Sequence, residues 1–132
     1  MSIIYTIPVY HCSPMCIDSF DFTHGVHFGG KLSAYEACLR KNVEEMFLHT
    51  CFLRLQNVTE TLDLGSVIGW DRLALEMRSE GFYTAKYVNK YEPDLSHSYF
   101  VVESSVIEVV SVEIVKSNEA EKMIEMFHKE IS

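Results

Sequence analysis

Three histidines and two cysteines near the start of the chain are the side chains best suited to chemistry. They are His11, Cys12, Cys16, His24 and His27. Structural zinc sites are usually built from closely spaced pairs such as C-x-x-C or H-x3-H, and this segment contains neither pair. The spacing therefore argues against a metal site, and we expect no metal ion.

The same residues could instead supply a nucleophile, with Cys12 or Cys16 attacking as a thiolate. A reactive thiolate needs a neighbouring histidine or a helix N-terminus to lower its pKa, and the local sequence offers no clear setting of that kind. We expect the four cysteines to be free thiols rather than disulfides, because a chain with this much apolar material does not need cross-links.

The glycines at positions 25, 29 and 30 lie in a loop where the backbone could approach a ligand closely. They do not match a phosphate-binding P-loop or a GxGxxG dinucleotide motif, because the required spacing and the Lys-Ser/Thr pair are missing. The sequence does not support hydrolysis of nucleoside triphosphates.

Composition limits the classes of protein to which the chain can belong. Its 132 residues, 48% of them hydrophobic, predict a single domain spanning 1–132. The net charge of −8 argues against nucleic acid as a partner. Apolar runs of only a few residues predict no membrane helix, and no secretory signal is recognisable, so we expect a cytoplasmic protein.

Hydrophobic periodicity predicts an α+β order of elements. Ser33 and Glu36 have the spacing of a capping box, and Tyr35, Leu39, Val43 and Met46 repeat behind them. We therefore expect a helix over 34–48. The expected strands are 3–11, 51–58, 82–90, 98–102 and 107–115, with a turn at 93–96. Two more helices are expected, one from Trp70 to Glu80 with Gly81 after it, and one over 118–132.

Four segments resemble, in order, a known superfamily. They are Val9 to Ser13, Gly25 to Gly29, Phe52 to Val58 with Asp63 after it, and Gly81 to Glu92 with the strands that follow. Together they are similar to the ADP-ribosyltransferase superfamily, which includes bacterial mono-ADP-ribosylating toxins, phage-encoded transferases and poly-ADP-ribose polymerases. The likeness covers nearly the whole chain. It implies split antiparallel β-sheets flanked by helices, with NAD as a substrate.

The resemblance is to the histidine-type branch with a degenerate third motif. His11 stands at the place of the family's NAD-binding histidine, and His27 at the place of its second-motif tyrosine. Ser98 stands where the family has a glutamate, and Glu92 is the nearest substitute carboxylate. The resemblance thus implies Glu92 and Ser98 as catalytic residues.

The resemblance also implies a set of ligand-binding residues. Cys12 follows the histidine, and Phe28 begins the floor of the nicotinamide pocket. Tyr35, Phe28 or Tyr99 could stack on the cationic nicotinamide ring. Lys31, directly after the glycine pair, is expected to bind the diphosphate, with Lys86 as a weaker candidate.

Three functions remain open from the sequence. The first is an NAD-dependent mono-ADP-ribosyltransferase, a glycosyltransferase that modifies a protein partner and could be phage-encoded, acting on a host or defence protein in the host cytoplasm. The second is a catalytically inactive relative that binds NAD or a related nucleotide, or inhibits a protein by contact. The third is an interaction protein of phage origin that disables a bacterial defence system.

Overall fold

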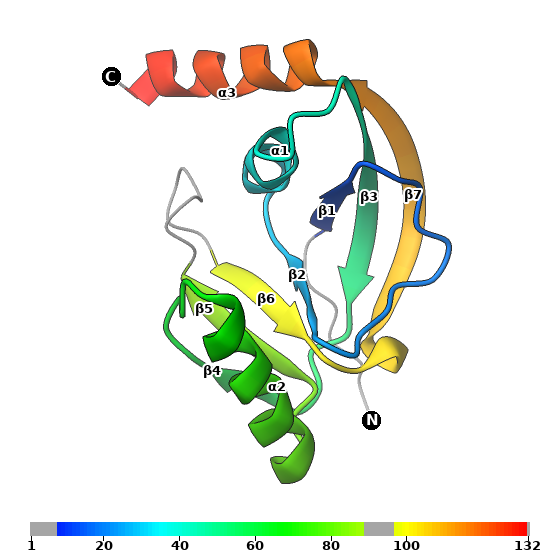
Figure 1. Ribbon diagram of the computed structural model, residues 1–132, viewed down its shortest axis with the longest axis vertical. Helices are drawn as coiled ribbons and strands as arrows, with labels where there is room; N and C mark the ends of the chain where they lie inside the picture. The colour runs from blue at the N-terminus through cyan, green and yellow to red at the C-terminus, as the bar shows by residue number, and fades with distance from the viewer. Residues whose placement is uncertain (1–7, 89–96, 132) are drawn as a thin grey trace.

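The computed structural model describes residues 8–88 and 97–131, which form an α+β fold with two β-sheets (Figure 1). The first sheet is antiparallel and has the strand order β1-β3-β7. The second has the order β2-β6-β5-β4. Its β4 and β5 run parallel, so the expectation of purely antiparallel sheets was wrong at this edge. The strands are β1 (Val9–Ser13), β2 (Val26–Phe28), β3 (Glu45–Leu53), β4 (Val58–Glu60), β5 (Thr84–Val88), β6 (His97–Val101) and β7 (Ile107–Lys116).

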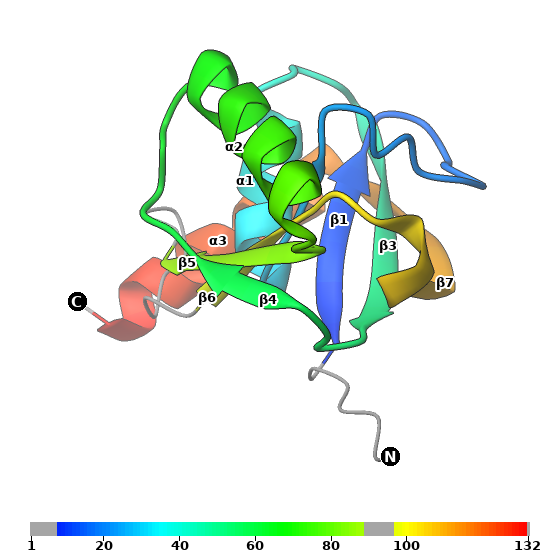
Figure 2. The ribbon, with the colours of Figure 1, turned by 90° about the horizontal axis from the view of Figure 1, so that it is seen from below.

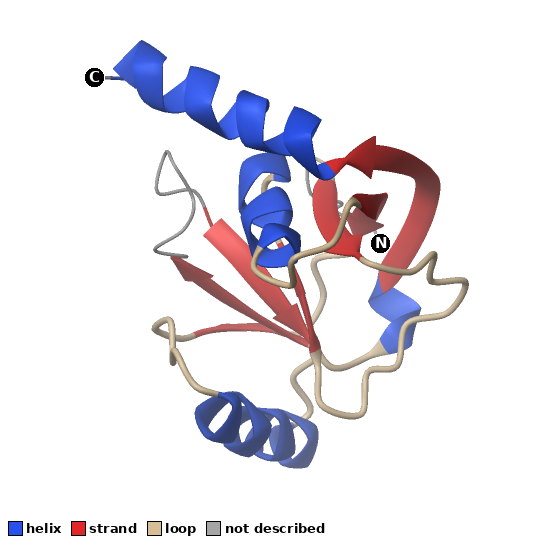
Figure 3. Ribbon diagram, turned by 45° about the horizontal axis from the view of Figure 1, so that its top comes forward, coloured by secondary structure: helices blue, strands red, loops and turns tan. Residues whose placement is uncertain are grey.

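Three α-helices cover these sheets, and a single 3₁₀ turn at Ser104–Val106 leads into β7. The helices are α1 (Lys31–Leu39), α2 (Val67–Glu80) and α3 (Ser117–Ile131). Helix α2 lies against the four-stranded sheet, whereas α1 and α3 stack on each other beside the three-stranded sheet (Figures 1 and 3).

The predicted helix ending at Gly81 is confirmed, and its ends show why it forms there. Ser66 accepts a hydrogen bond from the Gly69 N–H at the start of α2. Gly81 ends the helix in the left-handed conformation with φ of 81°, which glycine adopts without steric cost. The predicted C-terminal helix is also present, with Ala120 fully buried against α1 and the first sheet.

The helix expected over 34–48 was wrong in its second half. Helix α1 ends at Leu39, and after a left-handed turn at Asn42 the chain enters β3 at Glu45. In β3, Met46 and Leu48 are buried on one face, which is strand alternation. The capping box also does not form, because Gly30 is the N-cap and Ser33 is a buried residue within the helix.

The remaining strands lie close to their predicted positions. β1 continues to Ser13 rather than ending near His11, and the strand expected over 51–58 is divided between β3 and β4 by a bend at Asn57. β5, β6 and β7 match the last three expected strands within about two residues at most ends. The expected turn at 93–96 lies outside the described residues.

The two sheets meet where β1 passes the end of β2 (Figure 1), and Figure 2 shows β1 and β3 beside β4, β5 and β6, which α2 covers. The Tyr10 N–H donates to the Gly29 carbonyl at 2.7 Å, and the Gly29 N–H donates back to Tyr10 at 3.0 Å. Beyond this bridge the sheets diverge, and an apolar cluster fills part of the space between them. Its buried members are Val9, Phe28, Cys51, Leu53, Val101 and Val106.

Candidate functional site

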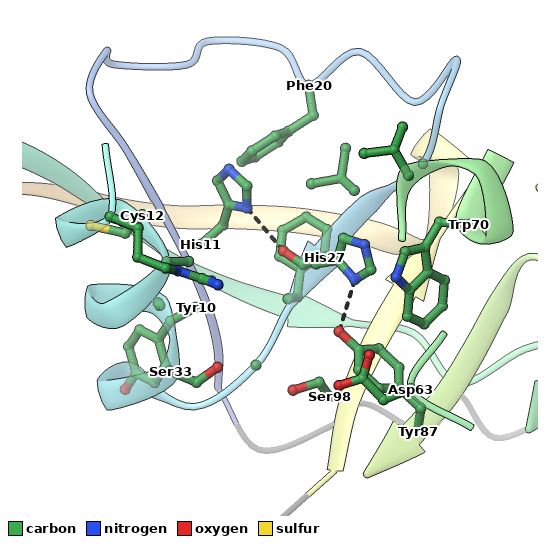
Figure 4. A pocket seen from close by; sticks show the side chains of 18 of the residues that line it. Tyr10, His11, Cys12, Phe20, His27, Ser33, Asp63, Trp70, Tyr87 and Ser98 are labelled. Atoms are coloured by element: carbon green, nitrogen blue, oxygen red, sulfur yellow. Dashed lines mark hydrogen bonds between the residues drawn. The ribbon is translucent and has the colours of Figure 1, made fainter. Parts of the chain in front are cut away.

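A cavity of about 660 Å³ lies where the two sheets meet (Figure 4). β1 and β2 form adjoining walls, while α1 and the first residues of α2 contribute two further sides. Because these elements come from widely separated parts of the chain, the cavity exists only in the folded domain. Its size is in the range of pockets that hold organic ligands.

His11 projects from β1 into this cavity, and one hydrogen bond fixes its ring. Its Nδ1 lies 2.9 Å from the carbonyl oxygen of His27. A carbonyl only accepts, so Nδ1 carries the proton and Nε2 is left as an acceptor. Burial lowers the pKa of His11, although the bond to His27 opposes that effect, while His49 and Lys41 reinforce it. His11 is therefore a neutral hydrogen-bond acceptor at pH 7.

His27 forms the adjoining wall with an aromatic group from the second sheet and α2. Its Nδ1 is 2.8 Å from the Tyr87 hydroxyl, and its ring meets Trp70 edge-on with centroids 4.6 Å apart. One edge of the His27 ring is exposed, but the surrounding aromatic rings exclude water from the rest of the ring. This desolvation lowers its pKa to about 4, and the negative charge of Asp63 opposes the shift.

The segment between β1 and β2, residues 14–25, covers one side of the cavity, and we call it the strap. Its Ile17 N–H donates to Nε2 of the buried His49 at 3.0 Å. Its Phe20 ring meets His11 edge-on at 5.1 Å between centroids. At its far end, Arg78 of α2 donates to the Phe22 carbonyl. The strap is thus tied to both sides of the cavity.

Charged side chains around the cavity have an uneven distribution. Arg40 and Lys41 line it just after α1. Asp63 lines it between β4 and α2, and Asp21 lines it from the strap. The cavity therefore offers two cationic side chains from one segment to an anionic ligand, in a chain whose net charge is −8.

Five of the residues expected to bind or act on the ligand line the cavity. They are His11, Cys12, His27, Phe28 and Ser98. They come from β1, β2 and β6. Glu92 lies outside the described residues, so its role stays a prediction.

Three expected ligand-binding residues lie elsewhere. Tyr35 is 1% exposed in the core between α1 and the first sheet, and burial raises its pKa to about 12. Tyr99 belongs to the opposite face of β6 from Ser98, because side chains alternate along a strand. Lys31 lies over the Tyr10 ring, 5.6 Å from its centroid, and does not line the cavity.

Several cavity residues were missed by sequence reasoning. Trp70 and Tyr87 come from a predicted helix and a predicted strand, and Asp63 was noted only as part of the resemblance, without a role at the site. For Arg40 and Lys41 a signal was present, since two adjacent cations stand out in an acidic chain and Asn42 after them favours a helix end. The misplaced helix over 34–48 concealed that signal.

Cys12 lines the cavity as a protonated thiol. Burial raises its pKa to about 12, and the neighbouring Cys38 adds to the rise. A thiol with such a pKa is a poor nucleophile at neutral pH. Cys12 therefore contributes packing to the cavity wall rather than nucleophilic chemistry, and all four cysteines are free, as expected.

Comparison with models of protein families, with curated proteins and with solved structures gives no match for this chain. Within residues 8–88 and 97–131, no group of three or more metal-ligating side chains could hold a metal ion. In the same described part, no helix combines the length and apolar character needed to cross a membrane. Functional inference therefore depends on the cavity.

Proposed function

We propose that the chain binds NAD in the cavity between its two sheets and transfers the ADP-ribose unit to a protein. The observation that carries this proposal is the geometry of His11. Its ring is fixed by the His27 carbonyl, so its Nε2 can accept a hydrogen bond from a ribose hydroxyl. Its neutral state at pH 7 preserves that acceptor.

The rest of the cavity suits the remaining parts of a nicotinamide dinucleotide. The aromatic rings of Phe20 and Trp70 line it, and such rings attract a planar cation by about 0.5–2 kcal/mol. Arg40 and Lys41 replace Lys31 as the candidates for binding the diphosphate. In NAD the cationic nicotinamide ring and the diphosphate are separated by a ribose, so the aromatic residues and the cations of the cavity could bind them separately.

The reaction would break the bond between nicotinamide and ribose through a transition state with positive charge on the sugar. Such a transition state is stabilised by a carboxylate held near the ribose. Ser98 is buried at the cavity wall and supplies a hydroxyl that can hydrogen-bond to the ribose. The acceptor would be a side chain of a partner protein.

Calorimetric titration with NAD tests binding. We expect His11→Ala to weaken NAD binding about three- to tenfold, the value of one neutral hydrogen bond. His128→Ala, which changes an exposed histidine on α3, is the matched control and should leave the affinity unchanged. Labelling of lysate proteins with ADP-ribose from NAD tests transfer, and equal labelling by the wild type and His11→Ala would contradict the proposal.

The serine at position 98 favours a second candidate, an inactive relative that binds NAD or a related nucleotide without chemistry. The family resemblance implies a glutamate there, and a serine hydroxyl cannot stabilise a positive sugar as a carboxylate does. Incubation of the protein with NAD for hours separates the two candidates. NAD binding without release of nicotinamide supports the inactive binder, and rapid release excludes it.

A further inference from the structure

Asp63 brings a carboxylate to the part of the cavity where Ser98 lies. It belongs to the connection between β4 and α2, and it lines the same cavity as Tyr87 and Ser98, all three of which are labelled in Figure 4. The negative charge of Asp63 raises the pKa of His27 against the stronger effect of burial, which agrees with its place at the cavity wall.

The backbone after Asp63 holds this carboxylate in place. The Gly65 N–H donates to Asp63 Oδ1 at 3.2 Å, and Gly65 has φ of 68°, in the left-handed region. This turn leads directly into Ser66, the N-cap of α2. Only one carboxylate oxygen is used by the turn, so the other remains available to a ligand.

Asp21 is the other carboxylate among the described residues that line the cavity. Its Oδ1 accepts both the Thr23 N–H at 2.9 Å and the Thr23 hydroxyl at 2.6 Å. Asp21 is exposed on the strap, where water screens its charge. Asp63 is partly buried, and it lines the cavity together with Ser98.

We propose that Asp63 is the catalytic carboxylate of this site, in place of the glutamate for which Ser98 stands. This inference rests on the proposed function. The bond between C1′ of the ribose and the pyridinium nitrogen breaks, and its electron pair stays on nicotinamide. The Asp63 carboxylate stabilises the positive sugar. A bond then forms between C1′ and an acceptor oxygen, and the acceptor's proton passes to Asp63.

Asp63→Asn is the decisive variant, because the amide oxygen can still accept from the Gly65 N–H while the charge is lost. We expect nicotinamide release from NAD to fall about 100-fold in kcat, with the Kd for NAD changed less than about threefold. Asp71→Asn on α2 removes a carboxylate that faces His24 instead, at 3.3 Å, and should leave both quantities unchanged.

Folding is checked by the melting temperature, which should stay within about 3 °C of the wild type. Asp63→Ser is a second variant, because a serine hydroxyl can also accept a hydrogen bond in such a turn. In Asp63→Asn and Asp63→Ser alike, kcat for nicotinamide release should fall, while the Kd for NAD should change less than about threefold. A purely structural role would instead lower the melting temperature and weaken NAD binding together.

The outcomes separate this inference from the proposed function. If the wild type does not bind NAD, both are overturned. If the wild type binds NAD but releases no nicotinamide, the role of Asp63 is overturned while NAD binding stands. If release is unchanged in Asp63→Asn and lost in Glu92→Gln, the carboxylate is Glu92 and only the inference about Asp63 is wrong.

Discussion

His27 has an acid–base property that can be measured without a ligand. Surrounding rings lower its pKa to about 4, whereas an unfolded chain has a histidine pKa near 6.5. Between these two values the unfolded state binds more protons than the folded state. The free energy of unfolding therefore decreases as the pH falls from about 6.5 to 4.

We expect His27→Gln to reduce this loss of stability, because glutamine can keep a hydrogen bond to Tyr87 but does not titrate. Urea unfolding at pH 7 and pH 4.5 measures the effect. His128→Gln, at an exposed position, should keep the pH dependence of the wild type. The same dependence in His27→Gln and the wild type would contradict the lowered pKa.

Burial divides the cysteines into two classes of reactivity. Cys16 is exposed, whereas Cys12, Cys38 and Cys51 are buried. Burial raises the pKa of Cys12 and of Cys51 to about 12. We expect a thiol reagent at pH 8 to modify Cys16 rapidly in the folded protein, and to modify the three buried cysteines only after unfolding. Peptide mass spectrometry identifies the modified residue, and early labelling of Cys12 would contradict its placement.

At the scale of elements, the buried His49 ties the strap to the first sheet. Nδ1 of His49 lies 3.1 Å from the carbonyl oxygens of His11 and Phe47, so it carries the proton, and Nε2 accepts from Ile17. We expect His49→Leu to lower the free energy of unfolding by about 2 kcal/mol, since it leaves buried polar groups unpaired.

Limited proteolysis provides a local measurement of the same change. Cleavage within residues 14–25 should become faster in His49→Leu than in the wild type, while His128→Leu should show no change. Unchanged cleavage in His49→Leu would show that the other contacts of the strap are sufficient to hold it.

Two glycines with positive φ provide a matched test of how tightly the second sheet packs. A Cβ on Gly25 would lie 2.2 Å from the buried Phe100 ring, whereas a Cβ on Gly81 would meet nothing within 4 Å. We expect Gly25→Ala to cost about 3 kcal/mol, from strain and clash together, and Gly81→Ala about 1 kcal/mol, from strain alone. Equal costs in chemical denaturation would contradict this packing.

Elements were predictable from sequence where local signals agreed. Helix α2 was predicted from its apolar spacing and from the glycine that ends it, whereas its start at Val67, before the predicted Trp70, is set by the Ser66 N-cap. The segment from Tyr35 to Met46 has helical spacing, but Phe47 to Phe52 is rich in residues that favour strands. Pairing of β3 with both β1 and β7 decides its conformation, and this tertiary contribution is not visible in a short window.

At the scale of the whole molecule, the net charge of −8 makes the position of each cation important. We expect Arg40→Glu and Lys41→Glu each to weaken NAD binding about tenfold, whereas Lys31→Glu changes it less than about threefold, because Lys31 lies outside the cavity. Titration at two salt concentrations should show a weaker salt dependence for the first two variants. Equal losses in all three variants would indicate a general effect of net charge.

The candidate site was predictable only in part. His11, His27 and Ser98 were expected in the site only from the resemblance, and they lie on β1, β2 and β6 at the cavity wall. Asp63, Trp70 and the cations after α1 enter the cavity through the packing of helices on sheets. The positions of these residues in the sequence do not indicate that they line one cavity.

The division of the strands between the two sheets also governs how the molecule can be assembled. The first sheet is complete only when β7 (Ile107–Lys116) has paired with β3. In the second sheet, β2 pairs only with β6. Such long-range pairings slow folding, because long loops must close before contacts form. During synthesis, the complete lining of the cavity can therefore assemble only after β6, which carries Ser98, has left the ribosome.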